Sequence, residues 1–189
     1  MSAGLTAYRE REPGIRPRPT IARMLDASAR RAVPLATCII AVLLLKAPSG
    51  LPGAAELQPG LLFASVFFWS VFRPASMSPV PVFLLGGFSD LLGAGPLGMT
   101  ALLLLWMHAL AVAGREFLAG LGFIAMWLVF SVVALIASGL QWGLTSLFLM
   151  HIMPAAPALF EAALACALYP LLSTCFTWAH RSIADPYRA

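Results

Sequence analysis

Charged side chains are scarce in this chain: lysine, arginine, aspartate and glutamate together account for 11% of its 189 residues. Average soluble domains carry about 25% charged residues. Apolar residues take their place, making up 60% of the sequence and raising its mean hydropathy to +0.88. This composition excludes an ordinary soluble domain and predicts an integral membrane protein whose apolar segments contact lipid.

Cysteine is scarce as well, and the chain lacks the short motifs of common enzymes. The three cysteines, Cys38, Cys166 and Cys175, all fall in apolar segments, which predicts buried thiols without disulfides or a bound metal. Phosphate-binding loops, zinc-ligand spacings and dinucleotide fingerprints do not occur in the sequence. We therefore expect no metal, no cofactor and no catalytic residues.

The basic residues are concentrated near the N-terminus. Seven arginines precede the first apolar run: Arg9, Arg11, Arg16, Arg18, Arg23, Arg30 and Arg31. Together with three prolines, they predict a disordered cytoplasmic arm over residues 1–31, with a short surface helix over residues 21–31. We expect this arm to contact anionic lipid and not nucleic acid, because acidic residues interrupt it and it carries a single aromatic side chain.

Six apolar segments follow the arm, separated by charged residues or by glycine and proline. They are predicted to be transmembrane helices at residues 32–45, 59–72, 78–92, 96–114, 117–138 and 154–178. The predicted fold is therefore all-α, a polytopic membrane domain over residues 32–178. Residues 179–189 are expected to form a cytoplasmic tail.

The basic residues between the segments predict the orientation. With the arm in the cytoplasm, six crossings place Arg73, Arg115 and the arginines of residues 179–189 on the cytoplasmic side, and only Lys46 outside. This arrangement satisfies the positive-inside rule and places both termini in the cytoplasm. The first segment is expected to be an uncleaved helix, because no small-residue cleavage site follows Leu45.

Asp90 is a carboxylate inside an apolar run, where a charge costs about 2.5–3.5 kcal/mol and normally faces other helices. Gly86, Asp90 and Gly93 recur at helical spacing and so share one face. Two interpretations follow. Asp90 could cap the next turn by accepting N–H groups of residues 93–95, or this glycine-lined face could pack against another helix or a partner.

A second carboxylate, Glu161, is predicted to lie at a similar height in the outer half of the membrane. We hypothesise a polar spot shared by Asp90 and Glu161, lined by Ser89 and closed from above by His151. The alternative is that Glu161 extends to the outer interface on its own. His108 is predicted to be a hydrogen-bonded packing residue and not a proton relay.

The order of these residues resembles a known family. Pro59 and Trp69 occur in the second segment, followed by Gly86-Gly87, the run from Asp90 to Gly93, and Pro96-Leu97-Gly98. This pattern resembles the bacterial rod shape-determining protein MreD over about residues 56–178, although the arginine-rich arm departs from that family. The candidate partner-binding or structural residues are Gly86, Asp90, Gly93, Pro96 and Gly98.

The resemblance implies a non-enzymatic, multi-pass subunit of the bacterial inner membrane that helps to maintain rod shape and to guide lateral peptidoglycan synthesis. Such a subunit pairs with the bitopic protein MreC. Through MreC it helps to link MreB filaments to a class B penicillin-binding protein and a RodA-type glycan polymerase. The implied fold is similar to the substrate-binding subunits of energy-coupling-factor transporters.

Two alternatives to a scaffold remain open. A small-ligand-binding or transporter subunit would need a cavity lined by several polar groups. A membrane enzyme acting on lipid-linked intermediates would need turnover that depends on Asp90.

Overall fold

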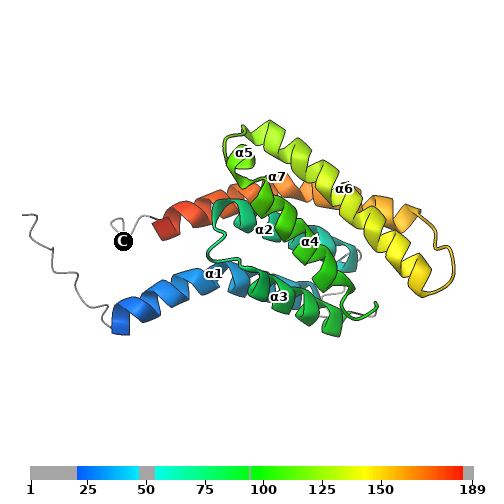
Figure 1. The fold of residues 1–189 in the computed structure, drawn as a ribbon, viewed down its shortest axis with the longest axis horizontal. Helices are drawn as coiled ribbons and strands as arrows, with labels where there is room; N and C mark the ends of the chain where they lie inside the picture. Colours follow the sequence, from blue (N-terminus) through cyan, green and yellow to red (C-terminus); the bar gives the residue numbers. More distant parts are fainter. Residues whose placement is uncertain (1–20, 47–53, 94, 185–189) are drawn as a thin grey trace, which may run out of the picture.

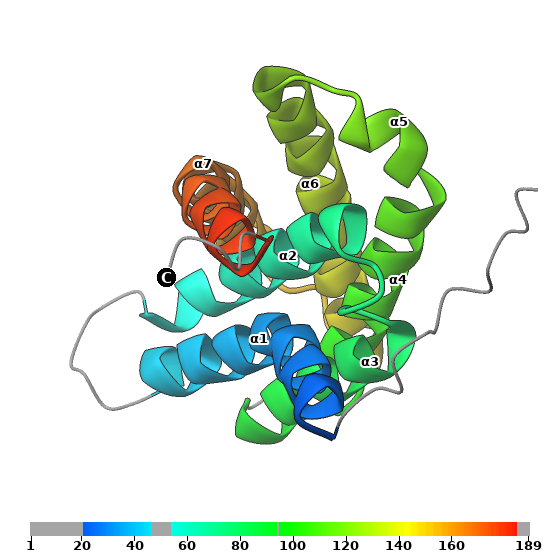
Figure 2. The same cartoon turned by 90° about the vertical axis from the view of Figure 1, so that its left-hand side faces the viewer.

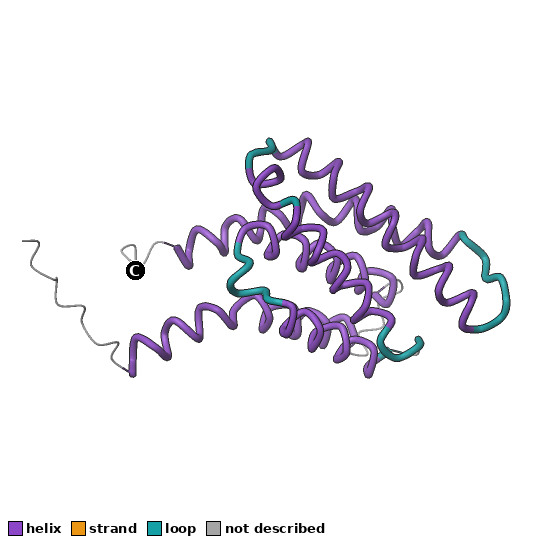
Figure 3. Tube along the Cα trace, in the orientation of Figure 1, coloured by secondary structure: helices purple, strands orange, loops and turns teal. Residues whose placement is uncertain are grey.

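A computed structural model describes the backbone of residues 21–46, 54–93 and 95–184, and the side chains of residues 32–46, 57–93 and 95–177. Within these ranges all regular secondary structure is helical, with seven helices and no strand (Figure 3). The all-α prediction is therefore confirmed. Most of the predicted arm, residues 1–20, and the end of the predicted tail, residues 185–189, lie outside the described residues.

Six long helices correspond to the six predicted segments, and a short one is additional. In chain order they are α1 (Ile21–Lys46), α2 (Ala54–Phe72), α3 (Pro79–Leu92), α4 (Met99–Ala113), α5 (Arg115–Ala119), α6 (Phe123–Phe148) and α7 (Ala156–Ala184). The helix expected over residues 21–31 exists, but it is continuous with α1. The second segment begins at Ala54, five residues before its predicted start.

The fifth segment differs most from its predicted bounds of 117–138. Its first residues belong to α5, and α6 begins only at Phe123, because glycines interrupt the chain between them. Gly122 has an extended backbone with ψ of 163°, which no helical residue adopts. At the other end, α6 continues to Phe148, ten residues past the predicted end of the segment.

Successive long helices run in alternating directions. Residues from the end of α1, the start of α2, the end of α3, the start of α4 and the end of α6 line one hollow at a single end of the bundle. We call this the polar end. Figure 1 shows the turn between α3 and α4 on the opposite side of the molecule from the C-terminus of α7.

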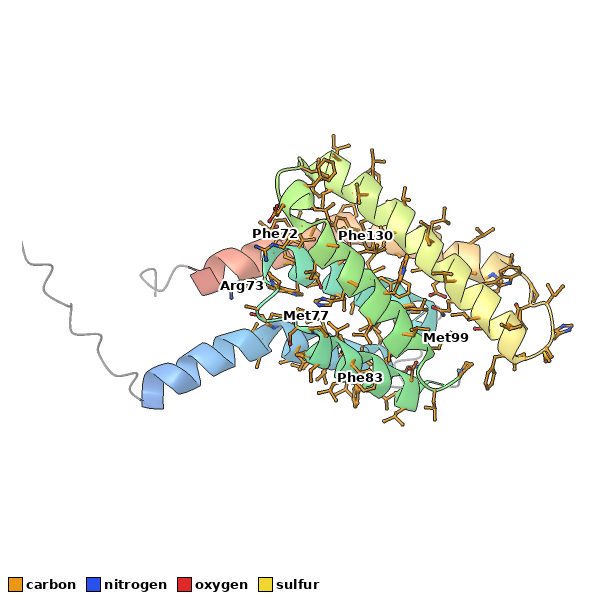
Figure 4. All side chains as sticks on the ribbon, viewed as in Figure 1. Phe72, Arg73, Met77, Phe83, Met99 and Phe130 are labelled. Atoms are coloured by element: carbon orange, nitrogen blue, oxygen red, sulfur yellow. The ribbon has the colours of Figure 1, made fainter. Side chains whose placement is uncertain are left out.

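The opposite end of the bundle carries arginine. Figure 4 shows Arg73, just after α2, at the other end from Met99, where α4 begins. Arg115, which follows α4, belongs to the same end as Arg73, because α5 packs against α2. We call this the arginine end.

Helix α2 is the centre of the bundle. Its residues from Leu62 to Val71 are all buried, and it packs against α1, α4, α5, α6 and α7 (Figure 2). A helix that is hydrophobic all round is suited to such a position. The ring centroids of Phe67 and Phe130 are 5.4 Å apart, and the ring of Phe130 stacks on that of Tyr169 with 4.3 Å between centroids. Aromatic contacts therefore join α2, α6 and α7.

The outer surface of the bundle is largely apolar. Two helical segments are long and apolar enough to cross a membrane: Phe123–Phe148, with mean hydropathy 2.4, and Ala156–Thr177, with 1.6. Both direct many large apolar side chains outward, among them Leu128, Leu135 and Leu159. The described chain thus contains two candidate membrane-spanning helices, together with four shorter apolar ones.

Candidate functional site

Asp90 joins the end of α3 to the beginning of α4. Its Oδ2 accepts the backbone N–H groups of Gly98 at 2.9 Å and Ala101 at 3.3 Å, and its Oδ1 accepts that of Thr100 at 3.0 Å. The first N–H groups of a helix have no partner within the helix, and a negative charge there also interacts favourably with the helix dipole. Asp90, which is buried, thus caps α4 from the neighbouring helix.

The capping interpretation was right about the kind of contact and wrong about the amides. Residues 93–95 were expected to donate. Residue 94 lies outside the described residues, and the N–H of Gly93 bonds instead to the backbone carbonyl of Asp90 at 3.1 Å. The cause is the turn between the helices. Gly98 has φ of +88°, a left-handed conformation that glycine adopts readily, and the amides that follow it face the carboxylate.

Gly86 allows α3 and α4 to pack with their backbones in contact. A Cβ atom at Gly86 would lie 2.3 Å from the Cα of Ala101 and 2.7 Å from its N. No side chain fits there. The next residue, Gly87, has no atom within 4 Å of an added Cβ. Gly86 lies one turn before Asp90. The backbone contact at Gly86 and the cap formed by Asp90 therefore join the same two helices.

The remaining candidate residues shape the turn. The carbonyl of Pro96 accepts the N–H of Met99 at 3.3 Å. A Cβ at Gly93 would lie 3.3 Å from the carbonyl oxygen of Ser89, a tight contact at the end of α3. The structure therefore brings Gly86, Asp90, Gly93, Pro96 and Gly98 together in one hairpin.

A polar pocket of about 290 Å³ opens beside this hairpin at the polar end. Its polar lining residues are Lys46, Gln58, Ser89, Asp90, Thr100, Gln141 and Thr145. The amide Nε2 of buried Gln58 donates to Ser89 Oγ at 2.7 Å. Our sequence reasoning gave no role here to Lys46, either glutamine or Thr145. The sequence did contain a pattern that could have indicated them: polar residues stand at the ends of several apolar segments, on the same predicted side of the membrane.

The predicted polar spot is not formed as expected. Ser89 lines the pocket, but Glu161 and His151 do not. His151 is exposed in the connection between α6 and α7, and Glu161 has an enclosed Oε1 with no hydrogen-bond partner in the described part of the chain. The reason is packing: α3 lies against α4 and α1, whereas α7 lies against α2 and α6.

His108 forms the hydrogen bond that was predicted for it. Its Nδ1 lies 2.8 Å from Ser70 Oγ, and both side chains are buried between α2 and α4. The three thiols are free. Cys38 is buried as predicted, but Cys175 is exposed, so its predicted burial was wrong.

Replacing Ser70 with alanine should destabilise the bundle by about 1–3 kcal/mol, because Nδ1 of His108 loses its buried partner. Thermal unfolding in detergent would measure this. Ser131→Ala is the matched control, since the Ser131 hydroxyl bonds only to the carbonyl of Trp127 one turn back in α6. Equal effects of the two substitutions would contradict a role for Ser70 between helices.

An apolar groove of about 580 Å³ lies between α1 and the α3–α4 hairpin, and Asp90 lines both this groove and the polar pocket. Leu35 and Ile39 of α1 line it opposite Phe83, Gly87 and Leu91 of α3. Phe83 and Leu91 are more than half exposed. The groove thus presents a continuous apolar surface whose floor includes a residue without a side chain.

The hydrogen bonds of Asp90 hold α3 against α4, and the groove offers an apolar surface for binding. In the described part of the chain, no group of three or more histidine, cysteine, aspartate or glutamate side chains could hold a metal ion. No protein-family model, curated protein or solved structure matches the chain.

Proposed function

We propose that the chain is a six-span protein of the bacterial inner membrane with both termini in the cytoplasm. The alternating directions of the long helices support this topology. So does the distribution of charge: Arg73 and Arg115 lie at the arginine end, and the only lysine, Lys46, lies at the polar end. The arginine end is then cytoplasmic.

The shorter helices require a thin bilayer. With 14 residues, α3 is about 21 Å long, compared with a hydrocarbon core of about 30 Å. Bilayers adjust to short helices by thinning locally. A protein of this kind would therefore gather a thinner patch of membrane around the α3–α4 hairpin.

Within this membrane, the chain acts as a non-enzymatic scaffold of the MreD type. It pairs with the single helix of an MreC-like protein, and through that partner with MreB filaments, a RodA-type polymerase and a class B penicillin-binding protein. The observation that carries this proposal is the apolar groove between α1 and α3. Small residues allow another helix to approach closely, and Gly87 in its floor has open space above it.

The geometry of Asp90 favours a scaffold over an enzyme. The three hydrogen bonds that the structure shows for the carboxylate come from the backbone N–H groups of Gly98, just before α4, and of Thr100 and Ala101 in its first turn. They engage the carboxylate in holding the hairpin. A braced hairpin presents a groove of constant shape, as expected for a binding surface. The resemblance to energy-coupling-factor subunits concerns the six-helix fold in this proposal, not transport.

Filling the groove should abolish partner capture without unfolding the protein. We expect Gly87→Leu to reduce co-purification of the MreC-like protein at least about tenfold, because leucine occupies the space that the partner helix would use. The matched control is Gly143→Leu in α6, where an added Cβ also meets no atom. The host is a rod-shaped bacterium depleted of its own copy of the protein and complemented with each variant. The measurements are affinity capture of the MreC-like protein and cell width.

Rounded cells and a lost partner with Gly87→Leu alone would support the groove as the recognition surface. Normal shape and undiminished capture with Gly87→Leu would contradict it. If depletion of the protein leaves cell shape unchanged, and the wild type captures no partner, the scaffold function itself would be contradicted. A tightly retained metabolite in place of a partner would then favour the ligand-binding alternative.

A further inference from the structure

The helices of the bundle fall into two groups of different length. Helices α3 and α4 have 14 and 15 residues, which makes them about 21 and 23 Å long at a rise of about 1.5 Å per residue. The apolar part of α1 is similarly short, because Arg31 and Lys46 bound it. Helix α6 has 26 residues and is about 39 Å long. One thickness of hydrocarbon cannot match α3 and α6 when both stand upright.

Tilt does not remove this difference. Transmembrane helices tilt by up to about 40° from the bilayer normal. At that limit α6 would still span about 30 Å, whereas an upright α3 spans about 21 Å at most. In agreement, Figure 1 shows the connection between α6 and α7 reaching beyond the turn between α3 and α4. The two helices therefore differ by at least about 9 Å in the hydrocarbon thickness that they match.

The outward face of α6 is apolar along its whole length. Ile124 near its start and Phe148 at its end are both 69% exposed. Gln141 and Thr145, near the same end, line the polar pocket, so they do not interrupt the face that would contact lipid. No lysine, arginine, aspartate or glutamate occurs in α6. The apolar surface on this side of the bundle is therefore as long as the helix itself.

The short helix α3 faces a different side of the bundle. It packs on α4 and α1, whereas α6 packs on α7, with α2 at the centre (Figure 2). Val80 and Leu84 of α3 are more than half exposed, and Lys46 ends the apolar run of the neighbouring α1. The molecule thus has a short apolar side at α1 and α3 and a long apolar side at α6.

We propose that the protein stands at a step in bilayer thickness and sorts membrane lipids, holding shorter acyl chains against α3 and longer ones against α6. A bilayer thins or thickens around a mismatched helix at a modest energetic cost for each ångström. Lipids whose chains already match the nearby helix avoid that cost. The inference rests on the membrane placement proposed above, extends the thinning at the hairpin to a difference between two sides, and needs no partner protein.

Fluorescence quenching in lipid vesicles would test this inference. The purified full chain, with its three native cysteines replaced by alanine, carries one fluorophore at Leu84→Cys in α3 or at Val132→Cys in α6, both at positions more than half exposed. The vesicles contain equal amounts of dimyristoleoyl and dierucoyl phosphatidylcholine, which have short and long chains. One of the two lipids is brominated and therefore quenches. Each signal is normalised to the quenching in vesicles of that brominated lipid alone.

With brominated short-chain lipid, we expect quenching about twofold stronger at position 84 than at position 132, and the reverse order with brominated long-chain lipid. Phe148→Asp places a charge at the end of the long apolar face, so the long-chain preference at Val132→Cys should fall while the signal at Leu84→Cys stays unchanged. His151→Asp is the matched control. It adds the same charge three residues further on, where an exposed polar side chain already stands, and should leave both signals unchanged.

Equal normalised quenching at the two positions would overturn the inference and leave the membrane placement intact. An unchanged long-chain preference in Phe148→Asp would overturn it as well. Absence of quenching at both positions would show that neither helix contacts lipid, and would contradict the membrane placement together with the inference. Failure to capture an MreC-like protein from cells would contradict the scaffold function alone, because the vesicles contain no partner.

Discussion

Replacing Gly86 with alanine should unfold or severely loosen the α3–α4 hairpin, with a loss of at least about 3 kcal/mol. An added Cβ would lie 2.3 Å from a backbone atom of Ala101. Backbone cannot rotate away as a side chain can, so α3 and α4 would have to separate. That separation would also lengthen the hydrogen bonds of Asp90 to α4. Thermal unfolding in detergent and the yield of folded protein would measure the effect.

The adjacent Gly87 provides the control for Gly86. Alanine there meets no atom within 4 Å, and it favours helix over glycine by about 1 kcal/mol, so Gly87→Ala should be neutral or slightly stabilising. The second substitution Ala101→Gly should not rescue Gly86→Ala, because the closest atoms belong to the backbone of residue 101. Rescue by Ala101→Gly, or equal stability of the two alanine variants, would show that the helices are not in backbone contact.

Replacing Asp90 with alanine should cost about 3 kcal/mol, because three backbone N–H groups, those of Gly98, Thr100 and Ala101, lose their side-chain acceptor. Asp90→Asn should cost less, since its one remaining oxygen still accepts. The loss should appear in thermal unfolding of the purified protein, with or without a partner. Glu116→Ala removes an exposed carboxylate from α5 and serves as the control.

The alternative role of Asp90 predicts a different outcome. If Asp90 recognises a partner helix directly, Asp90→Ala should unfold at the wild-type temperature and still fail to capture the MreC-like protein. A lower unfolding temperature in detergent, without any partner present, is the signature of the cap. Gly87→Leu is therefore the cleaner test of partner binding, because residue 87 takes no part in the hydrogen bonds of the hairpin.

The six long helices could be predicted because each depends on a local run of apolar residues. Breaks within such runs were harder to place. Residues 117–138 read as one uninterrupted apolar segment, yet the chain leaves helical geometry at Gly122. Glycine permits a break without requiring one. Whether a helix continues through it depends on the packing of α5 against α2 and α4, which no local pattern encodes.

The candidate site shows the same division. Capping by Asp90 could be anticipated, because its partners lie only 8 to 11 residues along the chain. Which N–H groups donate to Asp90 could not be anticipated, because this depends on the left-handed conformation of Gly98. The pairing of Asp90 with Glu161 failed for a different reason. The same predicted height does not make two residues neighbours, because α7 packs on α2 and α6, whereas α3 packs on α4 and α1.

The separation of contacts along the chain also bears on the order of assembly during synthesis. The α3–α4 hairpin joins neighbours in sequence, so its polar groups can pair as soon as both helices have left the ribosome. The aromatic contact between Phe67 and Tyr169 spans most of the domain, and loops of that length close late. Until α7 arrives, α2 has one aromatic face uncovered. The nascent protein is therefore most exposed to wrong helix pairing at its centre, just before α7 packs against α2.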